Sequence, residues 1–390
     1  MRIAVIGAGA SGLYGAIAIK KKHPEAEVTV FEKEAKIGRK LYATGNGHCN
    51  LLNAAVADKD FNHPDFLASY LSRYSFAFLK KTLTDWGILT WQEGDYVYPL
   101  SYSAPTYVGL LSALAMSLGI RFCLGVRLMD YELKGTKILL KVSAKPASID
   151  LSFDKLILAS GGESTPKLGS DGSLYPLLKK HSYSLVNPLP GLAPVKVVHP
   201  ETLKGLSGYR HEAKVSLLSS AGKVLYEEEG EVLYRDEGLS GIVVFNVESV
   251  YCRLSCPARS ELSLDLFPEF SFEELAGHLQ KSYQINPTFY GDAFFPEEVQ
   301  AHFGFGGVKD FLALAKRLKD DRYLIKGSEG FEHSQVTVGG LALTEVKATL
   351  ESRKEPGVYF TGEVLDVDGF CGGFNLTWAL LSALIVRDSL

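Results

Sequence analysis

Three glycines near the N-terminus constrain the fold of this chain most strongly. Gly7, Gly9 and Gly12 directly follow the apolar residues 2–6 and open a segment with helical spacing. A second apolar run ends twenty residues after Gly12, at Glu32. In such a unit the first glycine allows the turn, the second lets the backbone approach a pyrophosphate, and the third lets helix and strand pack closely. The pattern therefore predicts a βαβ unit with a dinucleotide at its helix N-terminus.

Glu32 and a second glycine pair refine this prediction. An acidic side chain at the end of the second strand accepts hydrogen bonds from ribose hydroxyls and disfavours a 2′-phosphate. A glycine-rich turn without a ligand is the alternative for the glycines alone, but strand, helix and acid in register favour a dinucleotide. The apolar residues 155–159 lead into Ser160, Gly161 and Gly162, where the backbone can pass close to a ligand, although an ordinary tight turn explains that doublet equally well.

The C-terminal region carries a third glycine signal. Gly362 and Glu363 precede residues 369–375, which contain three glycines and lead into an apolar helix. A helix N-terminus behind a glycine turn suits the electron-rich edge that a reduced flavin develops, and Glu363 is expected to bind the ribityl chain. A chain that returns to the ligand of its first strand after more than three hundred residues suits an extended FAD better than NAD. FAD is therefore the predicted cofactor.

Residues 38–50 belong beside Glu32 in this interpretation. The segment combines Arg39 and Lys40, two cations suited to phosphate, with glycines and amides that allow a close backbone approach. A solvated basic loop is the alternative, and for Lys40 alone it is favoured.

The length of 390 residues predicts two or three domains. After Gly162, prolines punctuate short strand-like runs, which indicates an inserted β domain. Residues 271–319 have helical spacing, which indicates a helical subdomain nested in that insertion. The predicted class is α/β, and the predicted boundaries are 1–187 and 337–390 for the cofactor domain, 188–265 and 322–336 for the β insertion, and 266–321 for the helical subdomain.

Charge and hydropathy exclude several classes of partner. The net charge of -4 and the pI near 6.2 provide no strong positive field, so no nucleic-acid partner is expected. Residues 96–120 carry no charge, but Pro99 and Pro105 interrupt the run, so a buried loop and then a helix from about Pro105 are expected instead of a membrane span. The apolar stretch 376–386 is too short to span a bilayer, and no membrane partner is expected.

The cysteines indicate a reducing compartment. Five cysteines without a C-x-x-C pair do not form the framework of a secreted protein, so a cytoplasmic location is expected. The apolar start mimics a signal peptide, but its cleavage would remove the glycine pattern. Cys252 and Cys256 lack further ligands at zinc spacing, and no metal is predicted.

Four motifs resemble one known family. GAGASG at 7–12, GRKLYATGNGHCNLLN at 38–53, GLSG at 238–241 and TGEVLDVDGFCGGFN at 361–375 carry the resemblance, which spans nearly the whole chain. The family is the BaiN-like, or YhiN-type, NAD(P)/FAD-dependent oxidoreductases, also called aminoacetone-oxidase-family FAD-binding enzymes. The resemblance implies a Rossmann-type FAD-binding domain of the two-dinucleotide-binding flavoprotein kind, a β-barrel-like insertion and a helical domain.

The resemblance also implies flavin contacts at Gly7, Gly9, Gly12, Glu32, Arg39, Lys40, Asn46, Asn50, Gly362, Glu363, Gly373 and Asn375. With the loops around them, the predicted FAD-binding set further includes Ala10, Ser11, Lys33, Gly38, Gly45, Gly47, Val126, Ala159, Ser160, Gly161, Gly372 and Phe374. His48 stands where the family usually has Arg, and Cys371 where Thr is common, which bears on the substrate pocket.

The leading functional hypothesis is a reductase, in which NAD(P)H passes hydride through flavin N5 to a small organic acceptor with an activated C=C bond. No second G-x-G-x-x-G occurs, so NADH or NADPH would dock transiently. An oxidase of a small amine or hydroxy compound, a non-catalytic flavin-binding module and a flavin-dependent RNA-modifying enzyme are the alternatives, and the acidic balance argues against the last. Candidate catalytic residues are His48, Cys49 and Cys371; the sequence indicates no oligomeric state.

Overall fold

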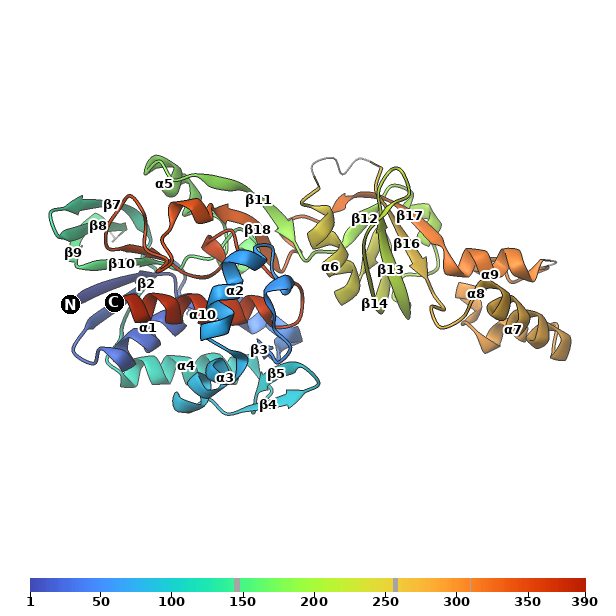
Figure 1. Ribbon diagram of the computed structural model, residues 1–390, viewed down its shortest axis with the longest axis horizontal. Helices are drawn as coiled ribbons and strands as arrows, with labels where there is room; N and C mark the ends of the chain where they lie inside the picture. Colours follow the sequence, from blue (N-terminus) through green and yellow to red (C-terminus); the bar gives the residue numbers. More distant parts are fainter. Residues whose placement is uncertain (144–147, 255–258, 309) are drawn as a thin grey trace. The chain divides into compact units, whose positions relative to one another are not determined.

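The computed structural model describes residues 1–143, 148–254, 259–308 and 310–390 (Figure 1). The chain divides into two compact units. Unit 1 comprises Met1–Leu189 and Gln335–Leu390, and unit 2 comprises Pro190–Ser334. The divisions fall at 189/190 and 334/335, each two residues from the predicted domain boundaries at 187/188 and 336/337.

Unit 1 is built on a parallel five-stranded sheet with the strand order β19-β10-β1-β2-β6. Its central strands read as continuous apolar runs because both faces of the sheet are covered. Helices α1 and α10 run side by side in this unit (Figure 1), and their close approach is possible because Gly15 faces the Ala383 methyl. The bounds are β1 (Arg2–Ile6), α1 (Ala10–Lys22), β2 (Glu27–Glu32), β6 (Arg121–Leu124), β10 (Lys155–Leu158), β19 (Val358–Phe360) and α10 (Phe374–Ser389).

The segment between β2 and β6 has the helices that its apolar spacing favours and a strand that was not expected. The helical spacing of residues 66–86 corresponds to two helices, because Tyr74 leaves the helical conformation and Ser75 caps the next helix by accepting from the Phe78 N–H. The expected buried loop after Tyr96 contains a strand, since its alternating side chains pair with two other short segments. The elements are β3 (Leu52–Asn53), α2 (Pro64–Arg73), α3 (Phe76–Asp85), β4 (Thr90–Glu93), β5 (Tyr96–Pro99) and α4 (Ala104–Ser117).

The remaining strands of unit 1 form two small sheets. An antiparallel sheet consists of β7 (Leu128–Lys134), β8 (Lys137–Ser143) and β9 (Ser148–Phe153). Strands β11 (Leu185–Gly191) and β18 (Val336–Leu341) form a two-stranded sheet, and α5 (Tyr175–Lys180) precedes β11.

Unit 2 contains a closed barrel of six strands in the order β12-β15-β14-β13-β16-β17. Strands β12 and β15 approach so closely that a Cβ at Gly238 would lie 1.8 Å from the Val195 carbonyl oxygen. Helix α7 begins with a capping box of Ser271 and Glu274. The bounds are β12 (Val195–Val197), β13 (Arg210–Leu218), β14 (Val224–Arg235), β15 (Gly238–Ser240), α6 (Ile242–Tyr251), β16 (Glu261–Asp265), α7 (Phe272–Ile285), α8 (Glu297–Phe303), α9 (Phe311–Lys319) and β17 (Asp321–Ser328). The predicted barrel-like insertion is thus confirmed, with helices α7 to α9 placed in the chain between β16 and β17.

None of the described helices is both long and apolar enough to cross a membrane. Over the same residues, no three His, Cys, Asp or Glu side chains gather in a way that could hold a metal ion.

Candidate functional site

The three glycine segments meet at one edge of the parallel sheet. Strands β1, β10 and β19 are neighbours, so the glycine turns at their carboxyl ends lie at the same edge. The Ser11 hydroxyl donates to the Thr361 carbonyl at 3.3 Å, and a Cβ at Gly362 would lie 2.5 Å from the Ser11 Oγ. Residues more than 340 positions apart are therefore in direct contact.

Residues 38–50 join the same edge from a different direction. The Gly38 N–H donates to the Ala8 carbonyl at 2.8 Å, which ties the start of this segment to the first glycine turn. At its other end, a Cβ at Gly373 would lie 2.9 Å from the Asn50 Oδ1. Between them, Gly45, Asn46 and Gly47 all have positive φ, at 54°, 52° and 86°. The segment thus bridges the first glycine turn and the C-terminal one.

The glycines of the first turn differ in what surrounds them. A Cβ at Gly7 would lie 2.4 Å from the Ala159 carbonyl oxygen, and one at Gly12 would lie 2.0 Å from the Gly7 carbonyl oxygen. A Cβ at Gly9 would meet nothing within 4 Å. Gly7 and Gly12 therefore serve close packing, whereas Gly9 borders open space at the start of α1.

Both helices that begin at this edge present bare N-termini. Gly9 is the residue before α1 and Gly373, with φ of 92°, the residue before α10, and neither can cap its helix with a side chain. The first N–H groups of a helix and its dipole favour anionic or electron-rich partners. Ala10 and Ser11 lie in the first turn of α1, and Phe374 and Asn375 in that of α10. This donor set fits the phosphates and the ring edge of a flavin dinucleotide.

Glu32 lies against the first glycine turn. Its Oε2 accepts from the Ala8 N–H at 2.7 Å, and its Oε1 accepts from the Glu34 N–H at 2.9 Å. The Val126 N–H donates to the Glu32 backbone carbonyl at 2.9 Å, which places Val126 at the same strand end. Each carboxylate oxygen keeps a further lone pair, so both can also accept from a ribose hydroxyl.

Glu363 is held by donors from three segments. Lys40 Nζ lies 2.8 Å from its Oε2, and its Oε1 accepts from the Ser164 hydroxyl at 2.8 Å and the Thr337 N–H at 3.0 Å. This network fixes the carboxylate at the turn after β19. The predicted contacts of Lys40 with phosphate and of Glu363 with the ribityl chain stay predictions.

The other predicted cations also face carboxylates. Lys33 pairs with Asp171, and Arg39 pairs with Glu34. Any phosphate role of these side chains would have to share or replace these pairs.

Hydrogen bonds between its own residues stabilise the C-terminal glycine turn, residues 369–375. The Asn375 Oδ1 accepts from the Gly369 N–H at 2.9 Å, and its Nδ2 donates to the Gly369 carbonyl at 2.8 Å. The Phe374 ring packs edge-on against Phe61, with centroids 6.1 Å apart. Asn375 therefore shapes the turn, and its implied flavin contact stays a prediction.

The contribution of Thr337 to the turn after β10 was not predicted from the sequence. Ala159, Ser160 and Gly161 follow this strand as expected, but Thr337 completes the turn, since its hydroxyl oxygen accepts from the N–H groups of Glu163 at 2.7 Å and Ser164 at 3.0 Å. A Cβ at Gly162 would lie 2.3 Å from the Thr337 Oγ1. The signal was in the sequence: residues 336–340 again place a glycine pair after an apolar strand, and both glycines have positive φ.

A second pair that the sequence analysis missed lies near the C-terminal turn. His63 Nε2 lies 2.9 Å from the Asp366 Oδ2, and Asn62 donates to the Asp366 Oδ1 at 3.2 Å. Phe61 forms a bridge with Gly369, which ties this segment to the turn.

The catalytic candidates occupy three different environments. Cys49 is completely buried, and burial raises the pKa of its thiol to about 11. The Cys371 Sγ lies 3.7 Å from the Gln335 Oε1 and is partly exposed. His48 stacks on Tyr102 with ring centroids 3.8 Å apart. Cys256 lies outside the described residues.

The environment of Cys49 yields a direct prediction. A thiol with a pKa of about 11 remains protonated at pH 8, and the thiolate is the reactive form. Iodoacetamide at pH 8 should therefore leave Cys49 unmodified in the folded protein and modify it in urea, as read by peptide mass spectrometry. The partly exposed Cys123 is the internal control and should react in both conditions. Rapid modification of Cys49 in the native protein would contradict this account and revive a thiol redox role.

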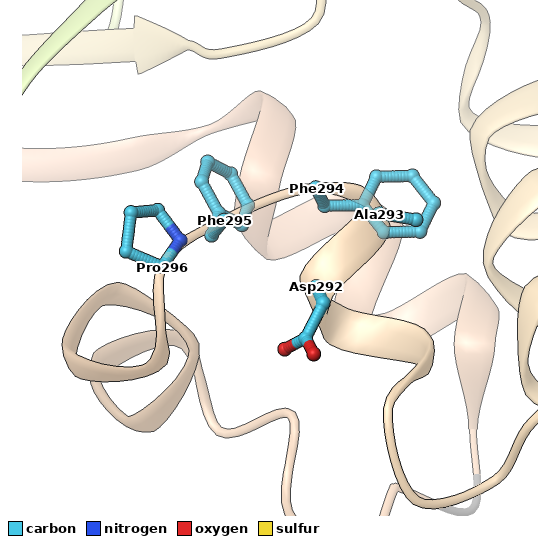
Figure 2. Close-up of a pocket in the computed structure, with 5 residues that line it drawn as sticks. All are labelled: Asp292, Ala293, Phe294, Phe295 and Pro296. Carbon is cyan, nitrogen blue, oxygen red and sulfur yellow. The ribbon is translucent and has the colours of Figure 1, made fainter.

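A cavity of about 370 Å³ lies in unit 2, lined by Asp292, Ala293, Phe294, Phe295 and Pro296 (Figure 2). Asp292 is the one ionisable residue among them, and its Oδ1 already accepts from Gln300 Nε2 at 2.8 Å. In Figure 2 its carboxylate points away from the Phe295 ring. The lining offers no convergent polar groups, so we place the candidate cofactor site at the glycine segments.

Known proteins resemble the chain over its full length. The HI0933-like protein Rossmann domain family matches residues 1–388. The 3-dehydro-bile acid delta(4,6)-reductase of Clostridium scindens is 32% identical, with 97% of this chain and 96% of that protein covered. A ribosomal RNA dihydrouridine synthase of Haemophilus influenzae is 26% identical, with 97% and 96% covered.

Solved structures agree on the fold. The 3-ketosteroid delta1-dehydrogenase of Sterolibacterium denitrificans superposes with a TM-score of 0.54 at 10% identity, covering 99% of this chain and 98% of that one. The predicted resemblance and fold class are confirmed. The chain belongs to the HI0933-like protein Rossmann domain family, with a Rossmann-type FAD-binding fold, and is an FAD-dependent oxidoreductase by class.

Proposed function

We propose that the protein is a reductase that uses NAD(P)H to reduce a C=C bond conjugated to a carbonyl group in a small organic acceptor. The observation that carries the proposal is the meeting of four glycine-bearing segments at one sheet edge, with two bare helix N-termini among them. FAD, when bound there, would supply hydride transfer between the nicotinamide and the acceptor. The reductase from Clostridium scindens supports this direction of reaction.

The side chains and helix ends at this edge have distinct roles in the proposal. The N-terminus of α1 beside Gly9 holds the phosphates, and Glu32 holds the adenosine ribose. Glu363, fixed by Lys40 and Ser164, orients the ribityl chain. The uncapped N-terminus of α10 would stabilise the negative charge of a reduced flavin held at this turn, which favours reduction.

Saturation of a C=C bond also requires a proton. His63 Nε2 is the candidate for this step, because it lies 2.9 Å from the Asp366 carboxylate in the segment that Phe61 ties to the C-terminal turn. His63 is partly exposed, so the ring can exchange protons with water. We therefore assign His63 the role of proton carrier in the proposed reaction.

Anaerobic stopped-flow absorbance tests the proposed function directly. Mixing the FAD-loaded protein with NADH or NADPH should bleach the flavin band near 450 nm, a wavelength set by the flavin itself. A conjugated enone added afterwards should restore the band. If neither nicotinamide bleaches the flavin, the reductase proposal is wrong; bleaching by an amine or a hydroxy compound, followed by recovery in O₂, would identify an oxidase instead.

Ribosomal RNA modification is a second candidate, because two relatives, 26% and 27% identical, are ribosomal RNA dihydrouridine synthases and dihydrouridine also arises by saturating a conjugated C=C bond. The acidic balance of unit 2 argues against RNA binding by that unit. Residues 190–334 contain 22 acidic and 15 basic side chains, the reverse of a polyanion-binding domain. Electrophoretic titration with uridine-containing ribosomal RNA decides the matter: micromolar binding that weakens steeply with salt would favour the RNA substrate.

A further inference from the structure

The antiparallel sheet β3-β5-β4 of unit 1 gathers aromatic residues on one face. Asn53 pairs with Tyr96, and Tyr98 pairs with Trp91. Cross-strand partners share a face, and so do residues two apart in one strand. These four side chains therefore project from the same side, while Val97 is buried on the other side. We call Trp91, Tyr96, Tyr98 and the adjoining Tyr102 the aromatic face.

Three of the four rings of the aromatic face pack against one another. The centroids of Trp91 and Tyr98 lie 5.7 Å apart, those of Trp91 and Tyr102 5.3 Å, and those of Tyr98 and Tyr102 5.1 Å. Tyr96 and Tyr102 remain 36% and 39% exposed. Single exposed apolar residues are common on proteins, but a contiguous patch of large rings marks a binding surface.

The aromatic face begins at the C-terminal glycine turn. Asn53 Nδ2 donates to the Gly372 carbonyl at 2.9 Å. The Tyr96 Cε1 lies 3.4 Å from the position of a Cβ at Gly372. The proposed function places the reacting end of the flavin at this turn, so a ligand lying on the aromatic face would reach the reaction centre.

His48 holds the far end of the aromatic face. Its Nδ1 lies 2.9 Å from the Tyr102 carbonyl oxygen, and the two rings stack with an interplanar angle of 8°. Tyr102 has a φ of 49°, a left-handed conformation that costs a non-glycine residue energy and persists only where neighbours impose it. We assign His48 as a positioning residue for Tyr102 and give it no catalytic step.

We propose that the aromatic face binds the ring system of the acceptor, an uncharged fused-ring compound whose conjugated C=C bond lies at the Gly372 turn. This inference rests on the proposed function. The four aromatic residues bring no cation, and Glu93 shares their side of β4 through its pairing with Tyr96, which disfavours phosphates and other anions. Stacked rings with hydroxyl edges suit a flat apolar molecule that carries a few carbonyl groups.

The test measures binding to the oxidised FAD-loaded protein by calorimetry, so it needs no turnover. The probes are androst-4-ene-3,17-dione, a four-ring enone, and 2-cyclohexenone, a single-ring enone. Tyr96→Leu and Trp91→Leu should each weaken binding of the four-ring enone about tenfold and change binding of the single-ring enone by less than about twofold, since stacked area is lost only for the larger probe. Gln92→Leu, on the opposite face of β4, is the matched control and should change neither.

The role of His48 is tested with the same probes. His48→Ala should weaken the four-ring enone as much as Tyr102→Ala does, whereas His48→Phe, which keeps the stacked ring, should restore most of the affinity. Unequal losses in the two alanine variants would contradict the positioning role.

The outcomes separate this inference from the proposed function. Suppose that NAD(P)H bleaches the flavin of the wild-type protein. If the leucine variants then bind the four-ring enone as tightly as the wild type, or the wild type does not bind it at all, the aromatic face is not the binding site of the acceptor, and the reductase proposal stands. If the enone binds as expected and no nicotinamide bleaches the flavin, the reductase proposal falls alone. Binding of an RNA oligonucleotide that Trp91→Leu abolishes would overturn the assignment of an uncharged ligand.

Discussion

Gly9→Ala should weaken FAD binding about 100-fold, which corresponds to about 2.7 kcal/mol, while leaving the free energy of unfolding of the apoprotein unchanged. An added Cβ at Gly9 meets no protein atom within 4 Å, and the backbone there, with φ of -79° and ψ of -168°, suits alanine. The space it would fill is where the second glycine of the turn admits the pyrophosphate. The dissociation constant of FAD is measured by titrating the apoprotein with FAD and monitoring the quenching of flavin fluorescence.

Gly277→Ala is the matched control for this substitution. Gly277 also has nothing within 4 Å of its Cβ position, and it lies in α7 of unit 2. The affinity for FAD should be unchanged, and the helix should gain up to about 1 kcal/mol of stability. An affinity of the Gly9→Ala protein within about twofold of the wild type would mean that no phosphate approaches this turn, and the cofactor site would then have to lie elsewhere.

Trp378→Ala should destabilise unit 1 by about 3–5 kcal/mol, the cost typical of truncating a buried large aromatic residue. Trp378 is 1% exposed in α10, and its Nε1 donates to the Gly362 carbonyl at 3.2 Å. The substitution removes packing between α10 and its neighbours and leaves a buried carbonyl without its donor. All three tryptophans lie in unit 1, so the fluorescence of Trp86 and Trp91 during urea unfolding reports on this unit.

Trp378→Phe separates the two contributions. It keeps an aromatic ring in the core but removes the N–H donor, so it should cost about 1–2 kcal/mol. The alanine variant should also lose FAD, because the turn at Gly362 is no longer fixed from behind. A loss of stability below about 1 kcal/mol for Trp378→Ala would show that α10 does not anchor this turn.

The βαβ unit could be predicted because its determinants are local. Strands β1 and β2 occur where apolar runs end before Gly7 and at Glu32, and α1 begins at Ala10, within the glycine motif. Gly7 and Gly12 are required by contacts between neighbouring elements, so a short motif suffices to identify them. The inserted β domain could be predicted from its proline-punctuated strand-like runs, whereas its barrel form was implied only by the family resemblance.

The packing at the site could not be predicted in the same way. The Lys40–Glu363–Ser164–Thr337 network unites segments up to 323 positions apart, and no local period encodes which distant segments pair. The sheet of β3, β4 and β5 was missed because each strand is two to four residues long, too short for a clear alternation.

The sequence by itself determined the Rossmann-type βαβ unit, the return of the C-terminal glycines to the same sheet edge and the family, because glycines and apolar periods specify local backbone geometry. Only the tertiary structure decided that Cys49 is buried, that His48 stacks on Tyr102, and that an aromatic face extends from the Gly372 turn. The physical reason is that the burial, pKa and orientation of a side chain are set by the segments that pack around it, wherever they lie in the chain.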